Sequence, residues 1–282
     1  MAAGLTGRPP QDSPPGDAST ERAAPDDSTG DGSVADGPEL FLLGRWRLLV
    51  GGAEVEVPRA DQRLAALLAL RGPSSRAEVA PVLWPGRSVP EAKALLRNNL
   101  WRSGHAGGGL LQVDRERLSL GPTVSVDVQP IERAAHDLIG GSVVGGSVVG
   151  GGVGRPVMPP ERTRADLVDA GDLLDGWFDD WVLAERERLA VLRRSALEVL
   201  AERCYRHGLF GEALAAAEAA SRLDPLREGP TLTVIRVHLA EGNPALAVRC
   251  FDDLRARFRR ELGVEPDGRC RELILPHLPA SG

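Results

Sequence analysis

A repeat in the last third of the chain most strongly limits what the chain can fold into. Gly208 and Ala213 recur as Gly242 and Ala247, 34 residues further on. A period of this length is typical of helix pairs that stack into a solenoid. The expected helices span about 210–222, 227–240, 244–262 and 268–275. Such arrays bind other proteins or copies of themselves and rarely carry out chemistry, so the function must be sought upstream.

A long amphipathic segment, VLAERERLAVLRRSALEVLAERCYRHG, precedes the repeat. One apolar stripe runs along it at helical spacing, formed by Leu189, Leu192, Ala196, Leu200 and Cys204. The stripe predicts a long helix with one buried face. Gly208 is suited to end this helix, because glycine readily adopts the left-handed conformation that follows a helix.

Two short capped helices and a hairpin are predicted near the middle of the chain. Ser75 and Glu78 stand in the capping-box relation, and so do Ser88 and Glu91, with Pro90 in the first turn of the second helix. The following LLQVDRERLSL alternates apolar and polar residues around a charged turn. The order helix, helix, hairpin is that of a winged helix-turn-helix, whose second helix enters the major groove of DNA.

The flanking segments complete the organisation. Two stretches from Glu39 onward, ELFLLGRWRLLVGG and AEVEV, are expected to form short strands, and a helix is expected from about Arg59 to Leu70. After the hairpin, PTVSVDVQPIERAAHDLI indicates a strand and a helix.

Composition divides the chain into four parts. Residues 1–38 are rich in Pro, Asp, Ser and Gly and are expected to be disordered. The glycine-rich repeat at 140–154 is expected to be flexible. The parts are therefore a tail at 1–38, a winged helix-turn-helix at 39–130, a Gly/Val-rich linker at 131–165 and a helical domain at 166–278. The fold class is mixed and mainly α.

The charge distribution favours nucleic acid as a ligand of the winged helix alone. The whole chain has a formal net charge of −6, yet residues 40–130 hold 12 basic and 8 acidic side chains. Local charge, rather than net charge, meets the phosphates of DNA.

Other classes of function find little support in the sequence. No phosphate-binding loop occurs, the five histidines are scattered singly, and the cysteines have no paired spacing. We therefore expect no enzyme activity, no metal and no cofactor. No apolar run approaches the roughly 20 residues of a membrane helix, and no signal pattern begins the chain, so a cytoplasmic location is expected.

The second helix of the predicted motif carries a polar half and an apolar half. A helical wheel places Ala92, Leu95, Leu96 and Leu100 on the apolar half. The opposite half holds the candidate DNA contacts Lys93, Arg97, Asn98, Trp101 and Arg102. Arg suits guanine, Asn suits adenine, and Lys suits phosphate. Arg115 and Arg117 in the hairpin are candidates for phosphate or the minor groove. An ordinary solvated helix face and a soluble turn are the alternative interpretations.

Three motifs complete a resemblance to a known family: ERERL at 185–189, DPLRE at 224–228 and FRRELGVEPD at 258–267. With the strands and helices described above, they make the chain similar to the Streptomyces antibiotic regulatory protein family. That family joins an OmpR-type winged helix to an all-helical, tetratricopeptide-like bacterial transcriptional activator domain. The resemblance implies a DNA-binding transcriptional regulator, often an activator of specialised-metabolite genes. Double-stranded DNA, RNA polymerase or a sigma factor, and a second copy of the chain are the implied partners.

The chain departs from the family pattern at the end of the second helix. Ser103 stands where the family has an inward Leu, Gly104 and His105 replace two basic residues, and Asn99 replaces a small apolar one. We therefore expect this helix, at 91–103, to stop early. The alternative function is an adaptor protein whose winged helix has lost DNA binding.

Overall fold

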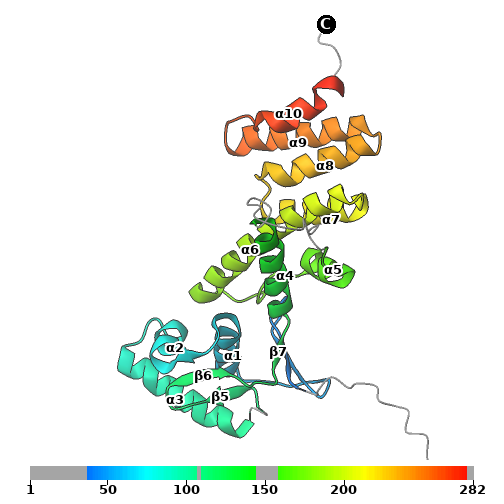
Figure 1. The fold of residues 1–282 in the computed structure, drawn as a ribbon. Helices are drawn as coiled ribbons and strands as arrows, with labels where there is room; N and C mark the ends of the chain where they lie inside the picture. Colours follow the sequence, from blue (N-terminus) through cyan, green and yellow to red (C-terminus); the bar gives the residue numbers. More distant parts are fainter. Residues whose placement is uncertain (1–36, 107–108, 144–157, 278–282) are drawn as a thin grey trace, which may run out of the picture. The chain divides into compact units, whose positions relative to one another are not determined.

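The computed structural model describes residues 37–106, 109–143 and 158–277, and at 102–106 and 141–143 it describes the backbone alone. Figure 1 shows the order of the elements along the chain. Nearly all of the expected tail and most of the expected 140–154 linker lie outside the described residues. Two residues of the expected tail, Gly37 and Pro38, are described. Pro38 is buried, and its carbonyl accepts a hydrogen bond from the amide of Ser125.

A small sheet begins the described chain. Its strands β1 (Glu39–Phe41), β2 (Arg47–Val50), β3 (Ala53–Glu54) and β7 (Ser125–Val126) lie in the order β3-β2-β1-β7. β1 pairs antiparallel with β2 and parallel with β7, so Leu40 lies opposite both Leu48 and Val126. These three side chains are buried, and the sheet therefore covers one side of the hydrophobic core that it shares with the helices described next. Short strands are confirmed in both stretches expected after Glu39, with β1 and β2 in the first stretch and β3 in the second.

A three-helix unit and a second sheet follow. The helices are α1 (Arg59–Arg71), α2 (Arg76–Leu83) and α3 (Val89–Ala106). The strands β4 (Ser74–Ser75), β5 (Leu111–Val113) and β6 (Arg117–Leu120) form an antiparallel sheet in the order β4-β6-β5. The capping box predicted for α2 is present, because Glu78 N donates to Ser75 Oγ and Ser75 N donates to the Glu78 carboxylate. The predicted helix-turn-helix and its hairpin are confirmed.

The stretch expected to be a linker contains a long packed helix. α4 (Val128–Val143) begins three residues before the expected boundary and continues into the glycine-rich repeat. Ile131, Ala135 and Leu138 are buried against helices of the C-terminal half. The expectation of a linker from residue 131 is wrong, because three apolar residues at helical spacing bury a face that a flexible segment would expose.

The described part of the C-terminal half consists of helices and the loops that connect them. Its helices are α5 (Glu161–Asp169), α6 (Asp180–Arg206), α7 (Phe210–Leu223), α8 (Glu228–Ala240), α9 (Pro244–Glu261) and α10 (Gly268–Ile274), followed by a short 3-10 turn, Leu275–His277. The expected bounds of α7 to α10 agree to within one residue. The long helix predicted around the leucine stripe is α6, and four of the five stripe residues are buried.

The 34-residue repeat has a direct structural meaning. Gly208 and Gly242 end α6 and α8 with positive φ angles of 74° and 75°. Ala213 and Ala247 lie fully buried in the helices that follow. The pairs α6–α7 and α8–α9 are therefore equivalent helical hairpins, and the predicted repeat is confirmed.

The winged-helix part and the C-terminal half share one hydrophobic cluster, here called the junction. Trp177, Trp181 and Leu189 pack into the cluster that also holds Leu64 and Leu68 of α1. Arg59 of α1 lies over the ring of Trp177, 3.5 Å from its centroid. Two ion pairs add to the contact, Arg63–Asp179 and Arg71–Glu185. Because apolar burial is the main favourable term in folding, this contact couples the two parts energetically.

Candidate nucleic-acid interface

Helix α3 is held by one buried face. Ala92 and Leu96 are almost fully buried with Val79 and Leu83 of α2, in the same hydrophobic cluster that forms the junction. Asn99 continues this face and is 2% exposed, so it is buried at the position where the family has a small apolar residue. Leu95 differs from the wheel prediction because it is 37% exposed. It lies at the margin of the apolar face, where a side chain one position before Leu96 points partly to solvent.

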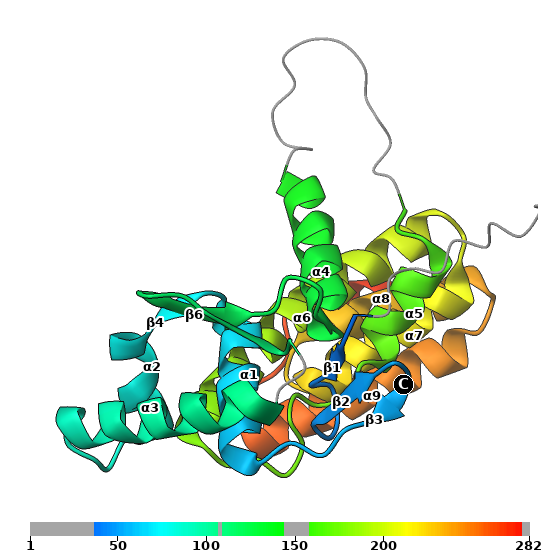
Figure 2. The ribbon, with the colours of Figure 1, turned by 90° about the horizontal axis from the view of Figure 1, so that it is seen from below.

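The opposite face of α3 presents the predicted contact residues. Lys93, Arg97 and Asn98 are exposed, and Trp101 is 72% exposed. Lys93, Arg97 and Trp101 follow one another at spacings of four residues, so they form one stripe along the helix. Figure 2 shows α3 along its whole length. The backbone of Arg102 belongs to the same helix, but its side chain lies outside the description.

The helix does not stop early. α3 continues through Ser103, Gly104 and His105 and ends at Ala106. The expectation of an early end is wrong, because glycine and serine in one turn weaken a helix by less than the preceding turns stabilise it.

A side-chain cap fixes the start of α3. The backbone amide and the hydroxyl of Ser88 both donate to the carboxylate of Glu91, at 3.0 and 2.8 Å. These hydrogen bonds hold the pKa of Glu91 below its ordinary value. A charged carboxylate in the first turn is stabilising at the positive end of the helix dipole. The cap therefore sets where the contact stripe begins.

The wing is tied to the helix-turn-helix by hydrogen bonds. Val113 and Leu118 face each other in the hairpin, and Ser75 of β4 lies opposite Arg117 of β6. Arg76, the first residue of α2, donates to the carbonyl of Arg115 at 2.5 Å. Both candidate wing arginines are exposed. Arg76 was not predicted as a site residue, although its place beside the capping box could have pointed to it.

The cations of this surface are available for an external partner. Within the described residues, none of the side chains of Lys93, Arg97, Arg115 and Arg117 forms an ion pair. We call the exposed face of α3 and the wing tip together the basic surface, formed by Lys93, Arg97, Asn98, Trp101, Arg115 and Arg117. Exposed, unneutralised cations of this kind can exchange counterions for DNA phosphates.

The family motifs serve architecture rather than this surface. In the first motif, Glu185 forms ion pairs with both Arg71 and Arg188. The next residue, Arg186, donates hydrogen bonds to three backbone carbonyls, those of Leu173, Leu174 and Trp177. Asp224 pairs with Arg194, and Glu265 pairs with Arg255 and Arg259. The sequence marked these motifs as specific, but only the structure shows that they hold helices to other helices and to loops.

The described residues show neither a metal-binding cluster nor a reactive thiol. They contain no cluster of three or more His, Cys, Asp or Glu side chains placed to hold a metal ion. Burial raises the pKa of the thiols of Cys204 and Cys270 to about 11, which leaves them protonated at neutral pH. In the same part of the chain, no helix combines the length and the apolar character that crossing a membrane requires.

Comparisons with known proteins agree with this arrangement. Residues 164–275 match the family described as the bacterial transcriptional activator domain. The fold resembles that of Mycobacterium tuberculosis EmbR, solved in complex with a low affinity phosphopeptide, with a TM-score of 0.60 and 18% sequence identity. The match covers 86% of this chain and 66% of the EmbR chain. No curated protein matches the sequence. The domain match shows a bacterial transcriptional activator domain at residues 164–275, and the likeness to EmbR shows a shared fold, in which this domain follows a winged helix-turn-helix.

Proposed function

We propose that the chain binds double-stranded DNA through the basic surface and regulates transcription, probing sequence with α3 in the major groove. The main support is the contrast between the two faces of α3. One face is buried in the hydrophobic cluster of the junction, and the other presents Lys93, Arg97 and Asn98 to solvent. Arg97 and Asn98 suit base edges, whereas Lys93 suits phosphate. The wing arginines Arg115 and Arg117 contact the backbone or the minor groove.

The role of the helical half in this proposal is contact with RNA polymerase or a sigma factor, or with a second copy of the chain. Support comes from the match to an activator domain at 164–275. The junction adds to it, because a shared hydrophobic cluster couples the helical half to the winged-helix part. Specialised-metabolite genes are the proposed targets, on the basis of the family alone.

Fluorescence anisotropy with the promoter DNA beside the chain's own gene tests the proposal. Full-length protein is titrated into labelled promoter and into a scrambled duplex of equal length, at several salt concentrations. We expect tighter binding to the promoter and a steep loss of affinity as salt rises. Lys93→Ala should weaken both duplexes alike and reduce the salt slope by about one.

A matched variant separates this surface from general charge. Arg249→Ala removes an exposed arginine of α9 and should leave both affinities unchanged. Equal and salt-insensitive binding of both duplexes, or no binding at all, would favour the adaptor function instead.

A further inference from the structure

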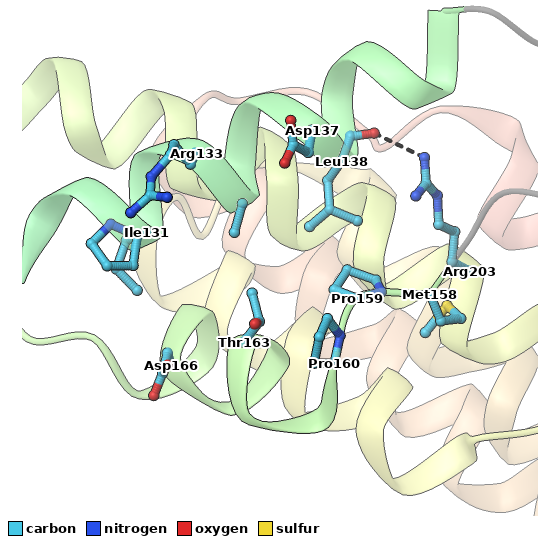
Figure 3. Close-up of a pocket in the computed structure, with 12 residues that line it drawn as sticks. Ile131, Arg133, Asp137, Leu138, Met158, Pro159, Pro160, Thr163, Asp166 and Arg203 are labelled. Atoms are coloured by element: carbon cyan, nitrogen blue, oxygen red, sulfur yellow. Dashed lines mark hydrogen bonds between the residues drawn. The ribbon is translucent and has the colours of Figure 1, made fainter. Parts of the chain in front are cut away.

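A groove between α4 and α5 combines an apolar floor with a buried arginine. Its volume is about 580 Å³, and Ile131, Leu138, Met158 and Pro159 supply much of its apolar lining. Figure 3 shows these side chains between the two helices, with Arg203 of α6 at one end. A volume of this size lies within the range of about 300–1,000 Å³ usual for small-molecule sites.

Arg203 is the unusual group in this groove. The residue is only 7% exposed, and among the described residues its side chain makes one hydrogen bond, from Nη2 to the carbonyl of Leu138, at 2.9 Å. Among the described residues no carboxylate forms an ion pair with it, and residues 144–157, between α4 and Met158, include no Asp or Glu. A buried charge without a counter-charge is costly.

Two other arginines of α6 with carbonyl partners make more hydrogen bonds than Arg203 does. Arg193 donates to the carbonyls of Leu167 and Val168 at the end of α5. Arg186 donates to three carbonyls, as described above. Within the described residues Arg203 donates to a single carbonyl, so its guanidinium retains N–H groups for an acceptor at the groove.

The start of α5 favours the same kind of acceptor. Thr163, in the first turn of α5, lines the groove with Pro160, and among the described residues no side chain caps this helix end. The unpaired amides of a helix start attract negative charge. The floor is apolar, whereas the charged side chains Arg133, Asp137 and Asp166 are exposed and lie around it.

We propose that this groove binds a small organic acid, with its carboxylate on Arg203 and its apolar body on the floor. A carboxylate suits the site because one planar guanidinium holds two oxygens in a fork geometry. A phosphate would leave charge unneutralised with a single buried arginine. No residue of α3 or the wing lines the groove, so this proposal does not rest on DNA binding.

Isothermal titration of the full chain tests the site. The probes are hexanoate and octanoate, with hexanol and octanol as neutral molecules of matched length. We expect one saturable site for an acid, with a dissociation constant at least tenfold below that of its alcohol. Arg203→Gln keeps a donor for the Leu138 carbonyl but removes the charge, and it should abolish this tenfold preference.

Further variants locate the site without touching Arg203. Thr163→Phe fills the groove and should weaken the acid at least tenfold, whereas Arg162→Phe, on the exposed side of the same helix, should not. Arg194→Gln removes the partner of Asp224 elsewhere on α6 and should leave acid binding unchanged. The proposal fails if no acid shows saturable binding, if acid and alcohol bind equally, or if Thr163→Phe has no effect.

Discussion

Arginine serves two different purposes in the two halves of this chain. On α3 and the wing, Arg97, Arg115 and Arg117 are exposed and make no ion pair with the described residues. In the helical half the arginines join neighbouring helices, in pairs that include Arg164–Glu212, Arg194–Asp224, Arg227–Glu198 and Arg236–Glu202.

The contrast shows that charge composition says little until partners are known. Residues 131–282 hold 20 basic and 24 acidic side chains, more cations than the winged helix has. Much of that positive charge is already neutralised by carboxylates of the same half. A surface for phosphates is therefore distinguished by unpaired cations rather than by their number.

Removing an unpaired arginine should have the largest effect on DNA affinity and almost none on stability. Arg97→Ala is expected to weaken promoter binding by about 1–3 kcal/mol, because a bidentate contact to a base is lost. Its melting temperature should stay unchanged, since the side chain is exposed. Anisotropy and calorimetry on the same preparation measure both. Unchanged promoter affinity with an intact fold would remove Arg97 from the base-reading set.

Removing a paired residue at the junction should have the reverse effect, a clear loss of stability with little change in DNA affinity. Glu185→Ala leaves Arg71 and Arg188 without their shared carboxylate, and we expect the free energy of unfolding to fall by about 2 kcal/mol. The value lies below that of a fully buried pair because both arginines reach solvent. Denaturant unfolding measures it. Glu187→Ala, an exposed neighbour on α6, is the control and should change stability by less than about 0.5 kcal/mol.

Acid should weaken the junction through the same carboxylate. Burial raises the pKa of Glu185, but hydrogen bonds from Arg188 and Arg71 outweigh burial and leave the pKa below its ordinary value of 4.5. The lowered pKa means that the charged form stabilises the fold at pH values above 4.5 and that this contribution is lost as pH falls below 4.5. Melting curves of the wild type and Glu185→Gln should therefore converge on acidification. A constant difference between them down to about pH 3 would contradict this assignment.

Removing an exposed pair should have the smallest effect. Glu265 contacts Arg255 and Arg259, and these hydrogen bonds lower its pKa, but all three side chains are well exposed. Surface pairs contribute little because water competes for both partners. Glu265→Gln should leave the melting temperature unchanged within error. A clear drop would show that pairing matters even at the surface of the helical half.

Much of the fold could be predicted from local sequence patterns. The Ser75–Glu78 capping box and the alternation of the wing each depend on residues a few positions apart, and the Gly208/Gly242 repeat depends on two short segments that share one pattern. Local hydrogen bonds and side-chain periodicity determine these elements, so one sequence suffices to place them. The exposure of Lys93, Arg97 and Trp101 followed from the same periodicity.

The contacts between distant segments were decided only by the tertiary structure. The sequence indicated a helix after the wing but not that Ile131 and Leu138 pack on other helices, so the linker was placed from residue 131. The sequence alone does not show that Glu185 meets Arg71, or that Arg203 lies buried at the end of a groove. Such contacts depend on the packing of whole helices, because burial and charge pairing are properties of the assembled fold rather than of local spacing.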